Sequence, residues 1–273
     1  MPHQLKIALL QISTGPDKLQ NLEKVNNSID ELGTDPDIVV TPEYLMGLQN
    51  GEISEEILNK NAETLDSEFV ETLRRKAKEM NLSILFTTYR RENGFFNSSV
   101  FVDDSGDVLG VYDKIHLFDA FDHEESDFFN WGENIVVFDW KDFKIGLATC
   151  FDLRFPELFR IIRFKGADMV LVPSGFYAGP HKAEQWRTLI SARAHENNFF
   201  VVGVDQPKPY FVGESMVASP LGYEVDRMGK EEGVRTVEID MQEVEEAWRN
   251  MPMEKLLRAD YYKKYEPYLY SEK

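Results

Sequence analysis

The sequence predicts an α/β fold, in which helices cover the faces of β-sheet, and three observations support this prediction. Short runs of apolar and β-branched residues alternate with amphipathic stretches along the whole chain, as in layered α/β domains. The 273 residues are 42% hydrophobic, which is enough to form a large core. The chain has no internal repeat, low-complexity linker or abrupt change of composition. We therefore predict one domain over residues 1–273 that includes a C-terminal tail.

Apolar runs bounded by Gly, Pro, Asn or Asp predict strands, and apolar residues at helical spacing predict helices. The expected strands cover residues 6–12, 37–44, 82–90, a hairpin over 97–118, 134–140, 143–150, 167–174 and 199–206. Further short strands are expected between Tyr210 and Asp240. The expected helices cover residues 20–33, 66–81, 155–166, 183–198 and 244–252.

Three chemically versatile side chains lie where predicted strands end, namely Glu43, Lys114 and Cys150. Reactive groups of layered α/β folds gather at such positions, because the rigid sheet directs them into a crevice. Taken alone, each has a structural interpretation: a loop acid, a surface charge and a small core residue, respectively. Together, a carboxylate and an ammonium directed at a thiol would supply a base, a nucleophile and an electrophilic stabiliser.

The segments around these residues resemble the three motif blocks of the nitrilase superfamily, also called carbon-nitrogen hydrolases. VVTPEY surrounds Glu43, YDKIHLFD surrounds Lys114 and ATCFDLRFPEL surrounds Cys150, and the resemblance extends over nearly the whole chain. It implies a four-layer α-β-β-α sandwich formed by a single domain. It also implies hydrolysis of a small linear amide to a carboxylate and ammonia through a cysteine thioester, as in the ω-amidases, without a cofactor or a metal.

The resemblance also implies roles for individual residues. Cys150 would attack the substrate carbon, and Glu43 would take the thiol proton, which a thiol of ordinary pKa retains at neutral pH. Lys114 and the backbone N–H of Phe151 would form the oxyanion hole, with Glu125 in a supporting role. The residues expected to bind substrate are Tyr44, Phe118, Arg154, Ser174 and Phe176.

Two features of the sequence depart from the family pattern. Trp131 precedes Gly132, where many relatives have proline, and we consider it as a further aromatic wall of the substrate pocket. The loop from Asp119 to Phe129 is unusually acidic and aromatic. Both departures concern the shape of the substrate and not the type of reaction.

Several alternatives stay open at this point. The same three residues suit a nitrilase or an N-carbamoyl amide hydrolase, and the same fold suits a noncatalytic small-molecule-binding protein. A Cys-His hydrolase would use His116, His181 or His195, none of which forms a local signature with Cys150. A metal site is conceivable from His116, Asp119, Asp122, His123 and Glu124. We prefer a hydrated acidic loop for that segment, because it lacks a zinc-binding signature.

Charge and composition also bear on partners and location. A formal net charge of −18 argues against nucleic acid and anionic membranes as partners. The chain shows neither a signal-peptide pattern nor a bilayer-length apolar run, and its single cysteine fits a reducing compartment, so we predict a cytoplasmic protein. The resemblance implies a homodimer, since relatives of this fold commonly pair through helices and C-terminal tails, and the aromatic tail LLRADYYKKYEPYLY suits such an interface.

Overall fold

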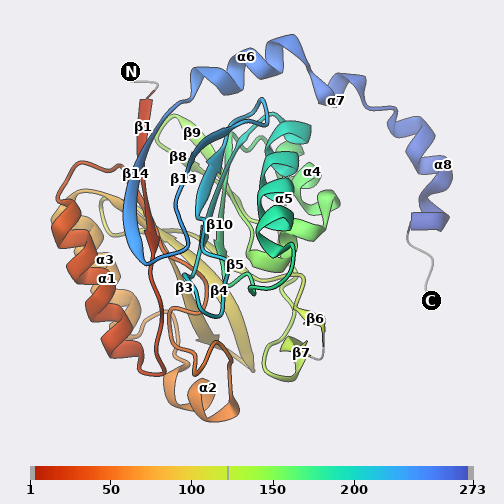
Figure 1. The fold of residues 1–273 in the computed structure, drawn as a ribbon. Helices are drawn as coiled ribbons and strands as arrows, with labels where there is room; N and C mark the ends of the chain where they lie inside the picture. Colours follow the sequence, from red (N-terminus) through yellow and green to blue (C-terminus); the bar gives the residue numbers. More distant parts are fainter. Residues whose placement is uncertain (1–3, 122, 270–273) are drawn as a thin grey trace.

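The computed structural model describes residues 4–121 and 123–269, and it has two six-stranded sheets stacked between pairs of helices (Figure 1). The first sheet contains, in spatial order, β14 (Gly233–Asp240), β1 (Gln4–Gln11), β2 (Ile38–Val40), β3 (Ser83–Arg91), β4 (Phe95–Val102) and β5 (Val108–Asp113). The second contains β13 (Glu224–Arg227), β12 (Met216–Ala218), β11 (Phe200–Asp205), β10 (Met169–Ser174), β9 (Phe143–Leu147) and β8 (Val137–Trp140).

Helices cover the outer face of each sheet. The first sheet is covered by α1 (Lys18–Leu32) and α3 (Glu68–Met80), and the second by α4 (Pro156–Phe164) and α5 (Lys182–Asn197) (Figure 1). This arrangement confirms the predicted α/β class and the four-layer α-β-β-α sandwich.

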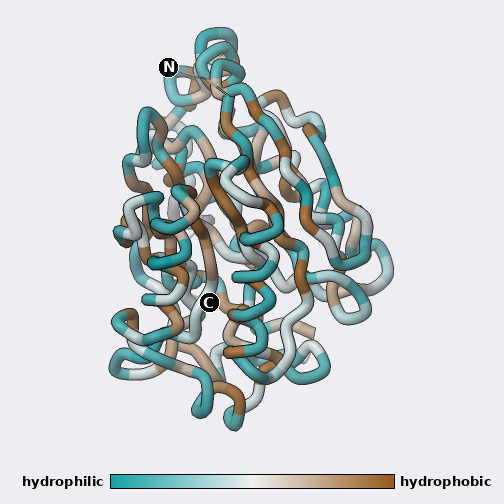
Figure 2. The backbone as a smooth tube through the Cα atoms, turned by 90° about the vertical axis from the view of Figure 1, so that its left-hand side faces the viewer, coloured by the Kyte–Doolittle hydropathy of each residue, from teal (hydrophilic) through white to brown (hydrophobic). Residues whose placement is uncertain are grey.

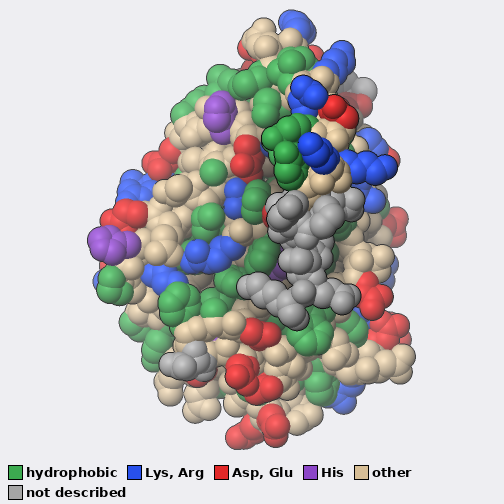
Figure 3. Space-filling model, turned by 90° about the vertical axis from the view of Figure 1, so that its right-hand side faces the viewer, with side chains coloured by type: hydrophobic (Ala, Val, Ile, Leu, Met, Phe, Trp, Pro, Cys, Tyr) green, Lys and Arg blue, Asp and Glu red, His purple; other side chains and the backbone are tan. Residues whose placement is uncertain are grey.

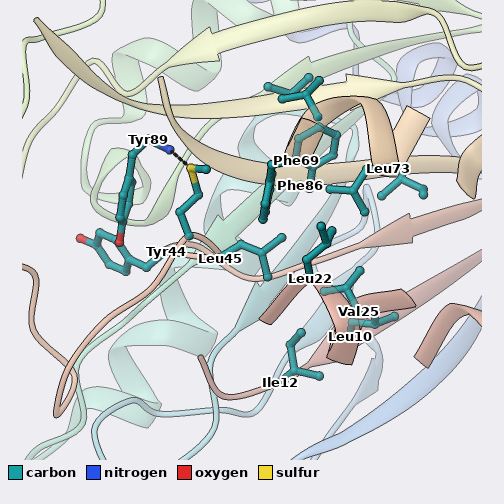
Figure 4. Close-up of a cluster of buried hydrophobic side chains, with 14 of the residues drawn as sticks. Leu10, Ile12, Leu22, Val25, Tyr44, Leu45, Phe69, Leu73, Phe86 and Tyr89 are labelled. Atoms are coloured by element: carbon teal, nitrogen blue, oxygen red, sulfur yellow. Dashed lines mark hydrogen bonds between the residues drawn. The ribbon is translucent and has the colours of Figure 1, made fainter. Parts of the chain in front are cut away.

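Three clusters of buried apolar side chains fill the spaces between the four layers. One lies between the first sheet and its helices, one between the two sheets, and one between the second sheet and its helices. Hydrophobic segments accordingly run along the strands, and the helices alternate between hydrophobic and hydrophilic residues (Figure 2). Figure 4 shows Tyr44 beside Tyr89 at one end of the first cluster.

The central strands explain why their sequences are almost continuously apolar. β1, β2 and β3 pair in parallel, as do β9, β10 and β11. All three residues of β2 are fully buried, since parallel strands are covered on both faces. Several predicted strands are shorter in the structure. Residues 37–44 contribute only β2, which ends before Pro42, residues 134–140 only β8, and residues 143–150 only β9, and the hairpin predicted over 97–118 ends with β5.

Several short elements lie outside the sequence prediction. They are α2 (Glu55–Asn61), β6 (Asp119–Ala120), β7 (His123–Glu124), η1 (Glu125–Asp127), η2 (Cys150–Arg154), α7 (Met253–Leu256) and α8 (Ala259–Leu269). The predicted helix over 244–252 is α6 (Gln242–Asn250). α6 packs on the end of the sandwich through the buried Val244 and Ala247, and from α7 to α8 the chain extends away from the sandwich (Figure 1). None of the helices in the described part of the chain is both long and apolar enough to cross a membrane.

The two sheets place the ends of their parallel strands close together. The backbone N–H of Glu43, just beyond β2, donates to the carbonyl of Ser174 at the end of β10 over 3.2 Å. The loops that follow these strands therefore meet at one edge of the sandwich, as expected for the carboxyl ends of parallel strands.

Candidate active site

A buried network of three charged side chains occupies this edge. Lys114 follows β5 directly, and its Nζ lies 2.9 Å from Glu43 Oε1 and 2.7 Å from Glu125 Oε2. The side chains of Lys114 and Glu43 are fully buried, and that of Glu125 is 5% exposed. Glu125 is therefore no solvated loop acid. An ammonium held between two carboxylates can remain charged without water, because its donors are paired.

Asn97 in β4 joins the two carboxylates of this network. Its Nδ2 lies 2.7 Å from Glu43 Oε1 and 2.9 Å from Glu125 Oε1. The sequence analysis missed this residue. The available signal was a polar amide within a predicted strand that is otherwise mostly apolar or small, and such a residue needs partners when buried.

Two residues that directly follow strands of the second sheet hold Glu43 in place. The N–H of Gly175 donates to Glu43 Oε2 over 2.8 Å, and Gln206 Nε2 donates to the Glu43 carbonyl over 2.8 Å. Gly175 has no room for a side chain, because a Cβ there would lie 2.8 Å from the Tyr44 ring. The close approach of the Gly175 backbone to the Tyr44 ring fixes the Glu43 carboxylate relative to the adjacent cavity.

Cys150 is the first residue of η2 and lines a cavity with an empty volume of about 330 Å³. Its φ of 45° lies in the left-handed region, which places the side chain at a sharp turn, a feature often found at functional sites. Thr149 and Asp152 form a capping box at this turn. Asp152 also accepts hydrogen bonds from the Tyr112 hydroxyl over 2.6 Å and the His116 backbone N–H over 3.1 Å.

The pKa values of all three candidate residues are raised, by burial for Cys150 and Glu43 and by neighbouring charges for Lys114. Burial raises the pKa of the Cys150 thiol well above its usual value, and the Glu43 charge raises it further. Burial also raises the pKa of Glu43, against the opposing effect of the Lys114 ammonium. The pKa of Lys114 is raised well above its usual value, because the charges of Glu125 and Glu43 together outweigh its desolvation. At neutral pH these directions favour a neutral Cys150 thiol and a charged Lys114 ammonium.

Phe151 follows Cys150 in η2, and its side chain lines the same cavity. Its backbone N–H has no acceptor among the described residues. A free N–H beside a thiol is available to a developing oxyanion.

The cavity brings together four of the five side chains predicted to bind substrate. Its wall contains Tyr44, Phe118, Arg154 and Phe176, with Gly175, Tyr177 and Lys182 as residues that the sequence analysis did not select. Ser174 does not contribute to this wall. It is fully buried at the end of β10, its Oγ lies 3.4 Å from the Val172 carbonyl, and its own carbonyl accepts the N–H of Glu43.

A second cavity of about 350 Å³ shares Tyr44, Phe118 and Tyr177 with the first. It is acidic, because Glu52, Glu124 and Glu125 line it. Trp131 contributes to neither cavity. It is 59% exposed and lines a separate open depression. The prediction that Trp131 forms a wall of the substrate pocket is therefore wrong.

The structure does not bring the candidate histidines to Cys150. His116 stacks on Phe155 at 3.7 Å and lies 2.7 Å from Asp152, His181 precedes α5, and His195 Nδ1 lies 3.4 Å from the Pro220 carbonyl. None of these three lines the Cys150 cavity.

The conceivable metal site is only partly described. Asp122, one of its five candidate ligands, lies outside the described residues. Among the residues that are described, no three acidic, histidine or cysteine side chains are grouped so as to hold a metal ion.

Comparison with known proteins places this geometry in context. The sequence profile of the carbon-nitrogen hydrolase family matches residues 6–249. The chain is 31% identical over 257 residues to an (R)-stereoselective amidase of a Pseudomonas species, covering 90% of this chain and 89% of that one. It is 29% identical over 272 residues to omega-amidase NIT2-A of Xenopus laevis, covering 95% and 97%. The crystal structure of XC1258 from Xanthomonas campestris, a CN-hydrolase superfamily protein, superposes with a TM-score of 0.83 at 28% identity, covering 92% and 96%.

Proposed function

The chain belongs to the carbon-nitrogen hydrolase family, and we propose that it hydrolyses its small amide substrate through a thioester at Cys150, with Glu43 as the base and Lys114 as an oxyanion donor. One observation carries this proposal: the buried Glu43–Lys114–Glu125 network adjoins the cavity that Cys150 lines, because Gly175 in the cavity wall donates its N–H to Glu43 Oε2 over 2.8 Å. The protein is thus a cysteine-dependent amidase.

In the first half of the reaction, Cys150 Sγ attacks the amide carbon and its proton passes to Glu43. The transfer conserves the total charge of the site, so it avoids adding a thiolate to two existing carboxylates. The Lys114 ammonium and the Phe151 N–H stabilise the oxyanion, and one such donor typically contributes about 3–4 kcal/mol. The C–N bond then breaks, and Glu43 returns the proton to the departing nitrogen, which leaves ammonia and a thioester.

In the second half, a water molecule gives a proton to Glu43 and attacks the thioester carbon. The C–S bond breaks, the thiolate takes the proton back from Glu43, and the carboxylic acid leaves and ionises in water. Lys114 cannot serve as the base, because its raised pKa keeps it protonated. Glu125 supports the reaction by keeping this ammonium charged and in position.

We further propose that the protein forms a homodimer and is located in the cytoplasm. Exposed apolar side chains on the tail support a homodimer, among them Leu256, Tyr261 and Tyr262. The lone cysteine, which must remain a free thiol to act as nucleophile, supports a reducing location such as the cytoplasm.

The experiment that tests the mechanism is Cys150→Ala, assayed by ammonia release from a panel of small amides and nitriles. We expect turnover to disappear for all substrates, with the free energy of unfolding changed by no more than about 1–2 kcal/mol. Intact mass spectrometry of the unmodified protein, quenched during turnover, should show one acyl adduct that is absent from Cys150→Ala. Retained hydrolysis by a correctly folded Cys150→Ala protein would remove Cys150 from the mechanism.

A further inference from the structure

Asp205 is a fully buried carboxylate that has no part in the proposed chemistry. It is the last residue of β11, where it lies opposite Ser174, the last residue of β10. Among the described residues it forms no ion pair with a lysine, an arginine or a histidine. A buried carboxylate without a cation costs free energy of folding unless its oxygens accept hydrogen bonds. The partners of these oxygens therefore indicate the role of Asp205.

Each carboxylate oxygen of Asp205 accepts a hydrogen bond from a backbone N–H group. Phe176 N–H donates to Oδ1 over 2.7 Å, and Gly213 N–H donates to Oδ2 over 2.9 Å. These bonds oppose the effect of burial, which raises the pKa of Asp205 well above its ordinary value. An asparagine in the same place would turn its NH₂ toward one of the two donors, so it could accept from only one of them.

The N–H group next to that of Phe176 belongs to Gly175, and it donates to Glu43 Oε2 over 2.8 Å. Two consecutive N–H groups of the loop that follows β10 thus bind two different buried carboxylates, the proposed base and Asp205. Because glycine adopts a wide range of backbone angles, the direction of the Gly175 N–H depends on how the peptides on both sides of it are held.

The two sides of Gly175 are held to different degrees. On one side, the Ser174 carbonyl accepts only the longer bonds from Glu43 N–H over 3.2 Å and from Gln206 N–H over 3.3 Å. On the other side, the Phe176 N–H donates to Asp205 over 2.7 Å. The Asp205 carboxylate is therefore the firmer of the two anchors.

Other contacts hold the same region without using this carboxylate. Val212 N–H donates to the Phe176 carbonyl over 2.9 Å, which keeps Phe176 in the wall of the cavity. Ser215 Oγ accepts from the Asp205 backbone N–H over 2.9 Å, which holds the end of β11. What the carboxylate adds is the orientation of the peptide between the cavity wall and Gly175.

From these contacts we infer that Asp205 is a positioning residue for the proposed base, because its carboxylate orients the loop after β10 so that the Gly175 N–H meets Glu43 Oε2. This inference rests on the proposed function and adds a residue to the same site. Asp205 does not line the Cys150 cavity, so it acts through Gly175 and is not itself a catalytic residue.

The test is a double-mutant cycle between Asp205→Asn and Glu43→Gln, assayed at high enzyme concentration by ammonia release from the fastest substrate of the amide panel. Asp205→Asn alone should lower kcat at least tenfold, because one backbone donor loses its acceptor and the loop turns away from Glu43. KM should change less than threefold, since Val212 still holds Phe176 in the cavity wall. In the Glu43→Gln background, Asp205→Asn should lower the residual kcat less than twofold, because no base remains to be positioned.

Ser215→Ala is the matched control for this cycle. It removes the hydroxyl that holds the Asp205 backbone and leaves both carboxylate bonds in place. The midpoint of urea denaturation should fall in this variant, and kcat should stay within twofold of the unmodified value. Asp205→Ser, a smaller side chain that keeps one acceptor, takes the place of Asp205→Asn in the cycle where that variant is not recovered folded.

Failure of this inference and failure of the proposed function give different results. A normal kcat in the folded Asp205 variant, or an equal fractional loss with and without Glu43, would overturn the inference, since Asp205 would then have a structural role alone. A raised KM with an unchanged kcat would also overturn it, because Asp205 would then shape the cavity wall and not the base. Normal rates in folded Glu43→Gln would instead contradict the proposed function, whatever the result for Asp205.

Discussion

Glu43 combines full burial with four well-defined partners, and this environment determines its expected pH behaviour. Its carboxylate contacts Lys114, Asn97 and the Gly175 N–H, while Gln206 holds its backbone carbonyl. The hydrogen bonds favour the charged form, but burial outweighs them and raises the pKa of Glu43 above its ordinary value of 4.5. A base with a raised pKa is better matched to a thiol than an exposed carboxylate would be.

We therefore expect kcat/KM to rise with pH through the raised pKa of Glu43. Below that pKa the carboxyl is protonated and cannot accept the thiol proton, so the acid limb should lie above pH 4.5. The raised pKa values of Cys150 and Lys114 predict a plateau across neutral and mildly alkaline pH, because neither group changes charge there. A pH profile of kcat/KM checks this. Activity that instead followed an ionisation near the ordinary thiol pKa would indicate a preformed thiolate.

Replacement of the base provides the matching mutational prediction. Glu43→Gln keeps the size and can still accept from Gly175, but it cannot take a proton, so kcat should fall by about 10²–10⁴-fold with the fold intact. Glu63→Gln is a suitable control, because Glu63 is a half-buried acid paired with Lys18 away from the cavity. Normal rates in purified, folded Glu43→Gln would exclude the base role.

At the scale of elements, the short helix η2 determines where the nucleophile points. Asp152 in this helix accepts from Thr149 N–H over 2.8 Å, from the Tyr112 hydroxyl and from His116. Asp152 is fully buried. It thus connects the turn that bears Cys150 to the strand β5 that precedes Lys114, and so fixes the nucleophile relative to the oxyanion donor.

We predict that Asp152→Asn lowers both stability and activity. The amide keeps one oxygen and places an NH₂ against donors that previously met an acceptor, which should cost about 2–4 kcal/mol of unfolding free energy. Urea denaturation measures this loss, and kcat should fall as the turn loosens. The control Asp226→Asn breaks an exposed ion pair with Arg235, where the expected change is below about 1 kcal/mol. Unchanged stability in Asp152→Asn would show that η2 does not depend on this carboxylate.

Elements with strong apolar periodicity were predictable from the sequence, and those defined by tertiary contacts were not. The stripe of Trp186, Ile190 and Ala194 predicted α5 almost to its ends, because all three are fully buried against the second sheet. α2 buries only Ile57 and Leu58 among its apolar residues, too few to form a recognisable pattern. The end of β9 at Leu147 was also missed, because the η2 turn is fixed by the distant Asp152–Tyr112 bond.

The same distinction applies to the site. Glu43, Lys114 and Cys150 could be selected because each follows a strand and lies in a motif block. Lys182 could not be selected from the sequence, because it reaches the cavity only through the packing of α5 against η2. A lysine at the start of a helix is ordinarily exposed to solvent. Asn97 needed the pairing of β4 with its neighbours to bring it to both carboxylates.

At the scale of the whole molecule, the first sheet joins strands from the N-terminal and the C-terminal parts of the chain. β1 and β14 pair antiparallel over eight positions, from Gln4 opposite Asp240 to Gln11 opposite Gly233. α6 follows β14 directly and packs on the sandwich through Val244 and Ala247. α7 and α8 extend away from the sandwich (Figure 1), and hydrophobic side chains lie at several places on the face beside the tail (Figure 3).

The exposed tail leads to a prediction about assembly. Leu256 is 62% exposed and Tyr261 and Tyr262 are 52% and 54% exposed, and an isolated helix as short as α8, 11 residues, is marginal in water. We expect a second copy to cover these side chains. Light scattering at micromolar concentration should give twice the chain mass of 31.6 kDa, and a chain ending at Asn250 should be monomeric. Leu19→Glu, which changes an equally exposed leucine on α1, should leave the dimer intact. A full-length protein that scatters as a 31.6 kDa monomer would refute the dimer, and a dimer that survives the truncation would move the interface from the tail to the sandwich.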